Sequence, residues 1–168
     1  VIDITERKQL EQQLQIRTDA LDNSMTAFAI VRDRKFLYAN RTYLRLWGYD
    51  RLSEILGTSP AGHALDPETA TAITTMVRRD GTYLGEFTAQ RRDGSTFEVR
   101  MQLQRLVSED GVETYFGTAI DITEEKQARV ALQKMADAFQ QAAIGIAMGR
   151  PGTDTIMACN PAYCRLAG

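Results

Sequence analysis

The side chains that most often carry catalysis or bind metals are scarce in this chain. His63 is the only histidine, in a segment rich in glycine and proline, beside Ser59 and Asp66, which are common loop residues. Any histidine-activated nucleophile would therefore depend on His63 alone. Four residues separate Cys159 from Cys164, and no second pair of ligands completes the four that zinc needs. We expect reduced thiols, no catalytic centre and no metal site.

The composition excludes several classes of protein. The 168 residues include 20 basic and 22 acidic side chains, and 43% are hydrophobic, which is enough for a folded core. A net charge of −2 argues against a broadly basic nucleic-acid surface. No apolar run approaches the roughly 20 residues that span a bilayer, and the first residues lack a signal-peptide pattern. The chain also lacks an initiating Met. We therefore expect an excised, cytoplasmic segment that contacts neither nucleic acid nor membrane.

A long internal repeat organises the chain. Residues 2–6 (IDITE) recur as residues 120–124, an offset of 120 − 2 = 118. A second block recurs at an offset of 120, with Asn40, Tyr43, Arg45, Leu46 and Gly48 returning as Asn160, Tyr163, Arg165, Leu166 and Gly168. A period of this length is the size of a whole domain, not of a solenoid unit.

The repeat predicts five segments. Residues 1–5 are the last strand of a preceding copy, 6–22 a linker helix, 23–123 one complete domain, 124–141 a second linker helix and 142–168 the opening of a following copy. The strand candidates at 144–148 and 156–158 have no sheet of their own. We expect them to be disordered, swapped onto a partner, or packed on the complete domain.

Both linker helices carry a narrow apolar stripe among polar residues. An amphipathic helix packed on its own domain and a two-stranded coiled coil between chains both fit the pattern. The shortness of the apolar seam favours the coiled coil and hence a homodimer. The dimer residues would be Leu10, Leu14 and Leu21 in the first helix and Leu132 and Phe139 in the second.

The complete copy has the pattern of an α+β domain. Short strands are predicted at 27–31 and 35–39, a short helix at 41–47 ending at Gly48, and a longer helix at 67–79 with Met76 on its inner side. Strands at 83–92 and 95–106 flank Asp93-Gly94, a strong hairpin signal, and a last strand covers 113–122. The result is a five-stranded antiparallel sheet, whose spatial strand order the pattern leaves open.

This ordered set of motifs resembles the PAS (Per-Arnt-Sim) family of sensory domains. The motifs are Tyr-Ala-Asn at 38–40, Leu-Trp-Gly-Tyr at 46–49, Ile-Leu-Gly at 55–57, Gly-Glu at 85–86, Arg-Arg-Asp-Gly-Ser at 91–95 and Gly-Thr-Ala-Ile-Asp-Ile-Thr at 117–123. The resemblance implies strand order 2-1-5-4-3, with small helices enclosing a pocket on one face. It also implies a dimerising sensor that precedes a histidine kinase or diguanylate cyclase in bacterial two-component or cyclic-di-GMP signalling.

The pocket implied by the resemblance would be lined by ordinary core residues. Two further residues have alternative interpretations: Asn40 as a turn cap or an amide contact to a ligand, and Trp47 as core packing or a stacking contact. Glu86 and Arg100 would place a charge at the pocket or face water. The expected lining is Ile30, Leu44, Trp47, Met76, Phe87, Met101, Leu103 and Phe116.

The resemblance also guides the expectation for cofactors. Haem-binding relatives carry a histidine on the long helix, which has none here, and His63 precedes it, so haem is not expected. Light-sensing relatives carry a flavin-reactive cysteine where this chain has Thr-Ser-Pro-Ala at 58–61. A flavin bound without a cysteine adduct, an unidentified small ligand and a ligand-free structural spacer are left as alternatives.

The junction between the last strand and the second linker helix is the predicted route for a signal. Asp121 is placed to cap the helix through its carboxylate, and Thr123 follows at the first turn. An ordinary capped helix and a signal relay are compatible interpretations of the same residues. We predict that movement of the sheet reorients the helix through this junction.

Overall fold

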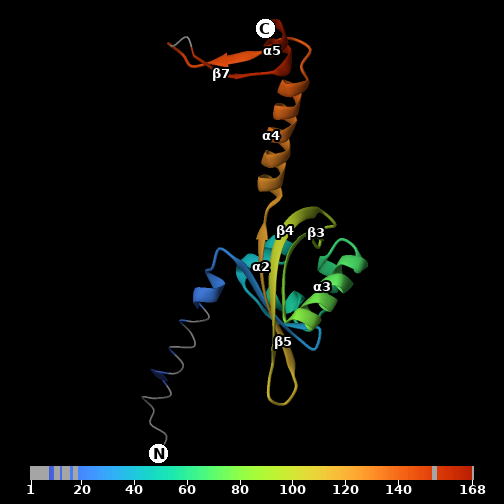
Figure 1. The fold of residues 1–168 in the computed structure, drawn as a ribbon. Helices are drawn as coiled ribbons and strands as arrows, with labels where there is room; N and C mark the ends of the chain where they lie inside the picture. The colour runs from blue at the N-terminus through green and yellow to red at the C-terminus, as the bar shows by residue number, and fades with distance from the viewer. Residues whose placement is uncertain (1–7, 10–11, 13–15, 17–18, 153–154, 168) are drawn as a thin grey trace, which may run out of the picture. The chain divides into compact units, whose positions relative to one another are not determined.

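The computed structural model describes residues 8–9, 12, 16, 19–152 and 155–167 (Figure 1). The chain divides into two compact units, Val1–Thr123 and Glu124–Gly168, each described here by itself. The predicted remnant strand at residues 1–5 lies outside the described residues.

The first unit is built on the predicted five-stranded sheet. Its strands pair antiparallel in the order β2-β1-β5-β4-β3, so the predicted fold and strand order are confirmed. The strand bounds lie within two residues of the prediction because turn signals, such as Asp93-Gly94 between β3 and β4, are local. The strands are β1 (Ala27–Arg32), β2 (Lys35–Ala39), β3 (Thr82–Gln90), β4 (Thr96–Val107) and β5 (Glu113–Asp121).

Capping residues set the ends of the helices. The Asp66 carboxylate accepts a 2.7 Å hydrogen bond from the backbone amide of Thr69, and Gly81 ends the same helix at φ 77°. Glycine adopts this left-handed conformation without strain, which is why it ends helices so often. The helices are α2 (Arg41–Trp47), the 3₁₀ turns η1 (Leu52–Glu54) and η2 (Pro60–His63), and α3 (Pro67–Asp80).

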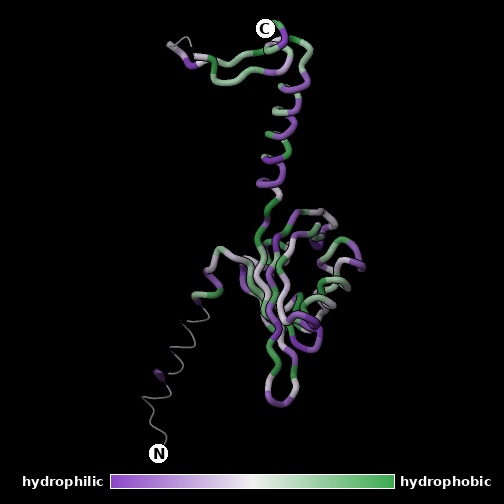
Figure 2. The backbone as a smooth tube through the Cα atoms, in the orientation of Figure 1, coloured by the Kyte–Doolittle hydropathy of each residue, from purple (hydrophilic) through white to green (hydrophobic). Residues whose placement is uncertain are grey.

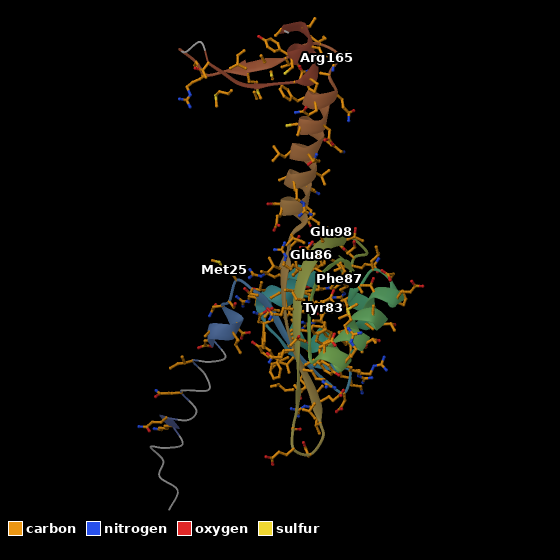
Figure 3. All side chains as sticks on the ribbon, in the orientation of Figure 1. Met25, Tyr83, Glu86, Phe87, Glu98 and Arg165 are labelled. Atoms are coloured by element: carbon orange, nitrogen blue, oxygen red, sulfur yellow. The ribbon has the colours of Figure 1, made fainter. Side chains whose placement is uncertain are left out.

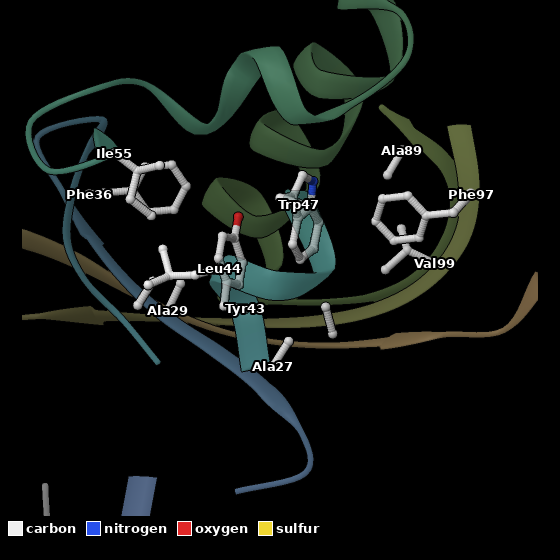
Figure 4. Close-up of a cluster of buried hydrophobic side chains, with 12 residues drawn as sticks. Ala27, Ala29, Phe36, Tyr43, Leu44, Trp47, Ile55, Ala89, Phe97 and Val99 are labelled. Carbon is white, nitrogen blue, oxygen red and sulfur yellow. The ribbon is translucent and has the colours of Figure 1, made fainter. Parts of the chain in front are cut away.

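The core lies between the sheet and these helices. Phe97 and Val99 alternate with polar residues along β4 and are buried on the helix side of the sheet. Figure 4 shows the Trp47 ring at the centre, between Tyr43 and Phe97. Its ring centroid is 4.2 Å from that of Tyr43 and 5.4 Å from that of Phe97. Aromatic packing of this kind anchors α2 to the sheet.

A fully buried asparagine connects four segments of the first unit. The side-chain oxygen of Asn40 accepts hydrogen bonds from the backbone amides of Phe28 and Tyr43, both at 2.9 Å. Its side-chain nitrogen donates to the carbonyl oxygens of Leu21 at 2.8 Å and Thr26 at 2.9 Å. An amide side chain has no further strong bonds to make. Asn40 therefore acts as the cap, and the alternative interpretation as a ligand contact is wrong.

The second unit repeats this arrangement on a smaller scale. The side-chain oxygen of Asn160 accepts from the backbone amides of Ile146 and Tyr163, both at 2.9 Å, and its nitrogen donates to the carbonyl oxygen of Ile144 at 2.9 Å. β6 and β7 pair with each other, so the expectation that these strands are disordered is wrong. The elements are α4 (Thr123–Gln141), β6 (Ala147–Gly149), β7 (Ile156–Cys159) and α5 (Pro161–Ala167).

Of the predicted dimer residues that the structure describes, Leu21 and Leu132 are exposed and Phe139 is half-buried. No residue of α4 is buried, Leu132 is 70% exposed, and polar residues predominate along the helix (Figure 2). Leu21 lies in a helical stretch and is also exposed, whereas Leu10 and Leu14 lie outside the described residues. Among the helices that the structure describes, none combines the length and apolar character required to span a bilayer.

We predict that Asn40→Ala lowers the free energy of unfolding of the first unit by roughly 3 kcal/mol, because buried backbone groups lose their partners. Trp47 is the only tryptophan and lies in this unit, so its fluorescence during urea unfolding measures the effect. The matched variant Asn160→Ala alters the second unit and should leave the urea midpoint of the Trp47 transition unchanged. An Asn40→Ala protein with the wild-type midpoint would contradict the role assigned to Asn40.

Candidate functional site

A cavity of about 150 Å³ lies between the sheet and the helices of the first unit. All five strands of the sheet contribute residues, and the opposite wall comes from α2, η2 and α3. Most of the lining side chains are apolar. They include Ala29, Val31, Phe36, Ile73, Val77, Phe87, Met101, Leu103 and Ala119.

Small residues on the two central strands make room for this cavity. Ala29 of β1 pairs with Gly117 of β5, and both face the helices. A Cβ atom on Gly117 would lie 2.8 Å from Cδ2 of Leu103, closer than real Cβ contacts. The glycine therefore lets Leu103 lie against the β5 backbone.

An uncharged polar pair forms part of the cavity wall. His63 is 8% exposed, and its Nδ1 lies 2.8 Å from the Tyr43 hydroxyl. Its Nε2 lies 3.4 Å from the hydroxyl of Tyr49. Burial lowers the pKa of His63 to about 4, so the ring is neutral at pH 7, and burial also raises the pKa of Tyr43. The pair can orient a polar group of a ligand without adding charge.

The charged residues beside the cavity are partly compensated. Arg34 and Arg78 contribute to the lining. The Nε of Arg78 lies 3.4 Å from the Tyr115 hydroxyl and 3.6 Å from a Glu113 carboxylate oxygen. The Tyr115 hydroxyl, followed by the nearby arginines, keeps the pKa of Glu113 below its usual value. The cavity thus suits a small, mostly apolar molecule.

Three of the predicted pocket residues line the cavity, and two others lie beside it. Phe87, labelled in Figure 3, comes from β3, while Met101 and Leu103 come from β4. Leu44 and Trp47 belong to the buried cluster on α2 and are not among the lining residues. Trp47 therefore packs in the core, and its indole N–H is buried with no hydrogen-bond partner in the described part of the chain.

Three other predicted pocket residues lie elsewhere, and those expectations were wrong. Ile30 pairs with Phe116 across β1 and β5, on the face of the sheet opposite the cavity. Apolar residues occur on both faces of these strands, so the expectation that the larger side chains face the cavity assigned the residues to the wrong face of the sheet. Met76 is 44% exposed because Ile73 and Val77, four residues apart, form the buried face of α3.

Two charged residues also proved to have no place in the cavity. Glu86 and Arg100 are paired across β3 and β4, and their side chains form a salt bridge of 2.8 Å. Their neighbours Phe87 and Val99 face the core, so this pair lies on the other face of the sheet. The alternative that placed a charge in the pocket is wrong.

Sequence reasoning missed the polar wall of the cavity. Neither Tyr43 nor His63 is among the residues that the sequence predicts for the pocket lining, yet both line the cavity. The local sequence did contain a signal, because residues 61–65 read Ala-Gly-His-Ala-Leu, in which a histidine stands among apolar and small neighbours. Only the packing of η2 against Tyr43 and Phe36 shows that this histidine is buried.

The residues around the cavity do not fit the cofactors considered for this chain. Pockets for ligands of drug size measure about 300–1,000 Å³, and this cavity measures about 150 Å³. It is too small for a flavin or a haem, and the amide of Asn40 has no free hydrogen-bonding capacity. Both ring nitrogens of His63 are engaged by tyrosine hydroxyls, as given above. Within the part of the chain that the structure describes, no three His, Cys, Asp or Glu side chains form a metal-binding cluster.

Hydrogen bonds of Asp121 and Thr123 and the burial of Ile122 fix the junction between β5 and α4. One carboxylate oxygen of Asp121 accepts a 2.9 Å hydrogen bond from the backbone amide of Thr123, the first residue of α4. The Thr123 hydroxyl accepts from the backbone amide of Glu98 on β4 at 2.9 Å. Ile122 between them is buried. Asp121 thus satisfies one of the amides that a helix leaves unpaired at its start.

Arg91 connects this junction to the helix α2. Its Nη2 lies 3.0 Å from the second carboxylate oxygen of Asp121, and its Nε donates to the carbonyl oxygen of Leu46 at 2.9 Å. The guanidinium lies 4.1 Å from the centroid of the Phe97 ring. The Arg91 side chain is only 26% exposed, so it belongs to the junction and not to a solvated charged face.

Comparison with known proteins agrees with this architecture. A family described as PAS fold matches residues 16–122, and one described as PAS domain matches residues 133–168. No curated protein matches the chain.

Several solved structures share the fold. A PAS domain from Colwellia psychrerythraea is 20% identical, with a TM-score of 0.60, over 67% of this chain and 98% of that one. The PAS domain of an HTR-like protein from Haloarcula marismortui is 27% identical, with a TM-score of 0.61, over 70% and 98%. A Light-Oxygen-Voltage domain studied with a flavin analogue is 25% identical, with a TM-score of 0.55, over 71% and 93%. Since the PAS fold match spans well over half of its residues, this chain belongs to the PAS family.

Proposed function

We propose that this chain is a non-catalytic sensory module that binds a small, mostly apolar ligand and passes the change to an output domain of the same polypeptide. The observation that carries the proposal is the double role of β5. Gly117 and Ala119 of this strand line the cavity, and Asp121, two residues further on, holds the first amide of α4. A histidine kinase or a diguanylate cyclase in the cytoplasm would be a suitable output.

The proposed signal is a shift between two arrangements of β5 and its neighbours. A ligand can shift this equilibrium only if it binds one arrangement more tightly than the other. A molecule in the cavity touches β5 and β4 directly, and both strands contribute to the junction through Asp121 and through the amide of Glu98. The ligand would thereby change how firmly the first turn of α4 is held.

The cavity distinguishes this proposal from its two rivals. A ligand-free spacer would have no need for empty space lined by Ala29, Gly117 and Ala119 on adjacent strands. A flavin receptor, suggested by the similarity to the Light-Oxygen-Voltage domain, would need a larger cavity. Mass spectrometry of molecules released from the purified protein by denaturation would identify a resident ligand.

The helix α4 supports a further part of the proposal, the formation of a homodimer. Leu132 and Met135 are each 70% exposed on a helix whose residues are otherwise largely polar. Pairing with the same helix of a second chain would bury these side chains, which is the principle of a coiled coil. Rotation of paired helices would then carry the signal from β5.

We predict that benzene, used as a probe, stabilises the first unit. An apolar cavity of about 150 Å³ can hold a molecule of this size. At a concentration roughly fivefold above its Kd, the probe should add about 1 kcal/mol to the free energy of unfolding. The melting temperature would rise by the same amount at pH 7.5 and pH 6, because His63, with its pKa of about 4, stays neutral at both.

The variant Ala70→Leu, which fills the cavity from α3, should abolish the effect of benzene. Thr71→Leu changes the neighbouring exposed residue of the same helix and should respond like the wild type. If benzene leaves the melting temperature of the wild type unchanged, or stabilises Ala70→Leu equally, the cavity is not a binding site.

We predict that Asp121→Ala lowers the free energy of unfolding by about 1 kcal/mol, the usual value of a capping interaction. It should also remove the effect of benzene on amide hydrogen exchange in the first turn of α4. Asp121→Asn keeps an oxygen for the Thr123 amide but loses the ion pair with Arg91, so it separates the two contacts. Unchanged stability together with an unchanged response to benzene would refute the relay.

We predict that Leu132→Glu weakens a homodimer by about tenfold or more in Kd, because each chain loses a buried leucine. Sedimentation velocity over a concentration series measures this change. Gln127→Glu adds the same charge at an exposed position of α4 outside the apolar stripe and serves as the control. A wild-type chain that stays monomeric at high micromolar concentration would exclude the dimer.

A further inference from the structure

The two cysteines flank the start of α5 in a specific way. Asn160 caps this helix, so Cys159 is the residue before the cap and Cys164 is the fourth residue of the helix. In many proteins these two positions hold apolar side chains that pack together, an arrangement known as a hydrophobic staple. The chain therefore places two thiols where the local fold brings side chains into contact.

The complete copy shows what normally occupies these positions. At the offset of 120 residues, Cys159 corresponds to Ala39 and Cys164 to Leu44, on either side of the cap Asn40. Ala39 and Leu44 are 2% and 7% exposed and belong to one buried cluster. The second unit keeps the same cap but replaces both apolar residues with cysteine.

The thiols lie close enough to react with each other. Their sulfur atoms are 2.8 Å apart, so they need to approach by less than about 1 Å to reach the roughly 2.05 Å of a disulfide. The Asn160 carbonyl accepts a 3.1 Å hydrogen bond from the Cys164 amide, which fixes the backbone between them. Among the residues that the structure describes, Cys159 is half-buried and Cys164 is exposed.

We propose that Cys159 and Cys164 form a reversible, redox-sensitive disulfide that converts the staple of α5 into a covalent link. With a hydroperoxide as oxidant, the Cys164 thiolate attacks one peroxide oxygen, giving a sulfenic acid and, for hydrogen peroxide, one water. The Cys159 sulfur then attacks the sulfenic sulfur, forms the S–S bond and releases a second water. Two thiols lose two electrons and two protons, and the peroxide is reduced to two waters.

The hydrogen bond between the two thiols supports this order of events. It is the largest cause of the raised pKa of Cys159, which favours the protonated thiol of that residue, and either sulfur can donate the bond. Two molecules of a thiol such as glutathione would reverse the reaction and become oxidised to their own disulfide. The link would join β7 to α5 within the second unit, independently of the cavity in the first.

The test treats the reduced 168-residue chain with one equivalent of hydrogen peroxide and counts free thiols. We expect the loss of both thiols, a decrease in intact mass by two hydrogen atoms, and a peptide containing the Cys159–Cys164 link. Glutathione should restore both thiols. Amide hydrogen exchange in α5 should become slower in the oxidised chain, since the link restrains its first turn.

The variants Cys159→Ala and Cys164→Leu restore the residues of the complete copy, so they keep an apolar staple while removing one thiol. Each should form no disulfide within the chain, and the double variant should show the same exchange in α5 with and without peroxide. The proposal is overturned if the wild-type chain keeps both thiols, forms disulfides only between chains, or is oxidised without a change in α5 exchange.

Discussion

The buried amide of Asn40 is the interaction on which the first unit depends. It joins the start of β1, the end of β2, the first turn of α2 and the segment before β1 through hydrogen bonds that leave the amide no unused capacity. Without it, several backbone groups would be buried without partners, which is costly in a core. Asn160 makes the equivalent bonds in the second unit. These bonds connect only residues close in sequence, so the hairpin and α5 can form without a larger sheet.

The cavity and the junction with α4 share the strand β5, and this gives the proposed sensor its route. β5 is hydrogen-bonded on both sides, to β1 and to β4, so it cannot move alone. Small residues facing the cavity make this part of the strand accessible to a ligand. Arg91 then joins the Asp121 end of β5 to the carbonyl of Leu46 on α2. A movement of the helices and a movement of the sheet would therefore both affect α4 through Asp121.

Most element bounds could be predicted because their signals are local, such as Asp66-Pro67 before α3 and Gly48 after α2. The strand order came from the family resemblance, since alternation along one strand says nothing about its neighbours. The cavity lining was harder to predict. β1 and β5 have apolar residues on both faces, so Ile30 was assigned to the wrong one. The burial of His63 depends on packing against Phe36 and Tyr43, which are more than 15 residues away in sequence, and the apolar neighbours of His63 are only a weak signal of it.

Gly117 has a consequence for how such modules evolve. The position requires no left-handed backbone, and a side chain there would meet only the flexible end of Leu103 and the Ala29 carbonyl. A single substitution could therefore move Leu103 and reshape the cavity while Asn40, Arg91 and Asp121 keep their contacts. Substitutions at position 117 can therefore change which ligands fit the cavity while the rest of the fold stays the same. In an array of similar copies, one could gain a new chemical input while its neighbours retain the old one.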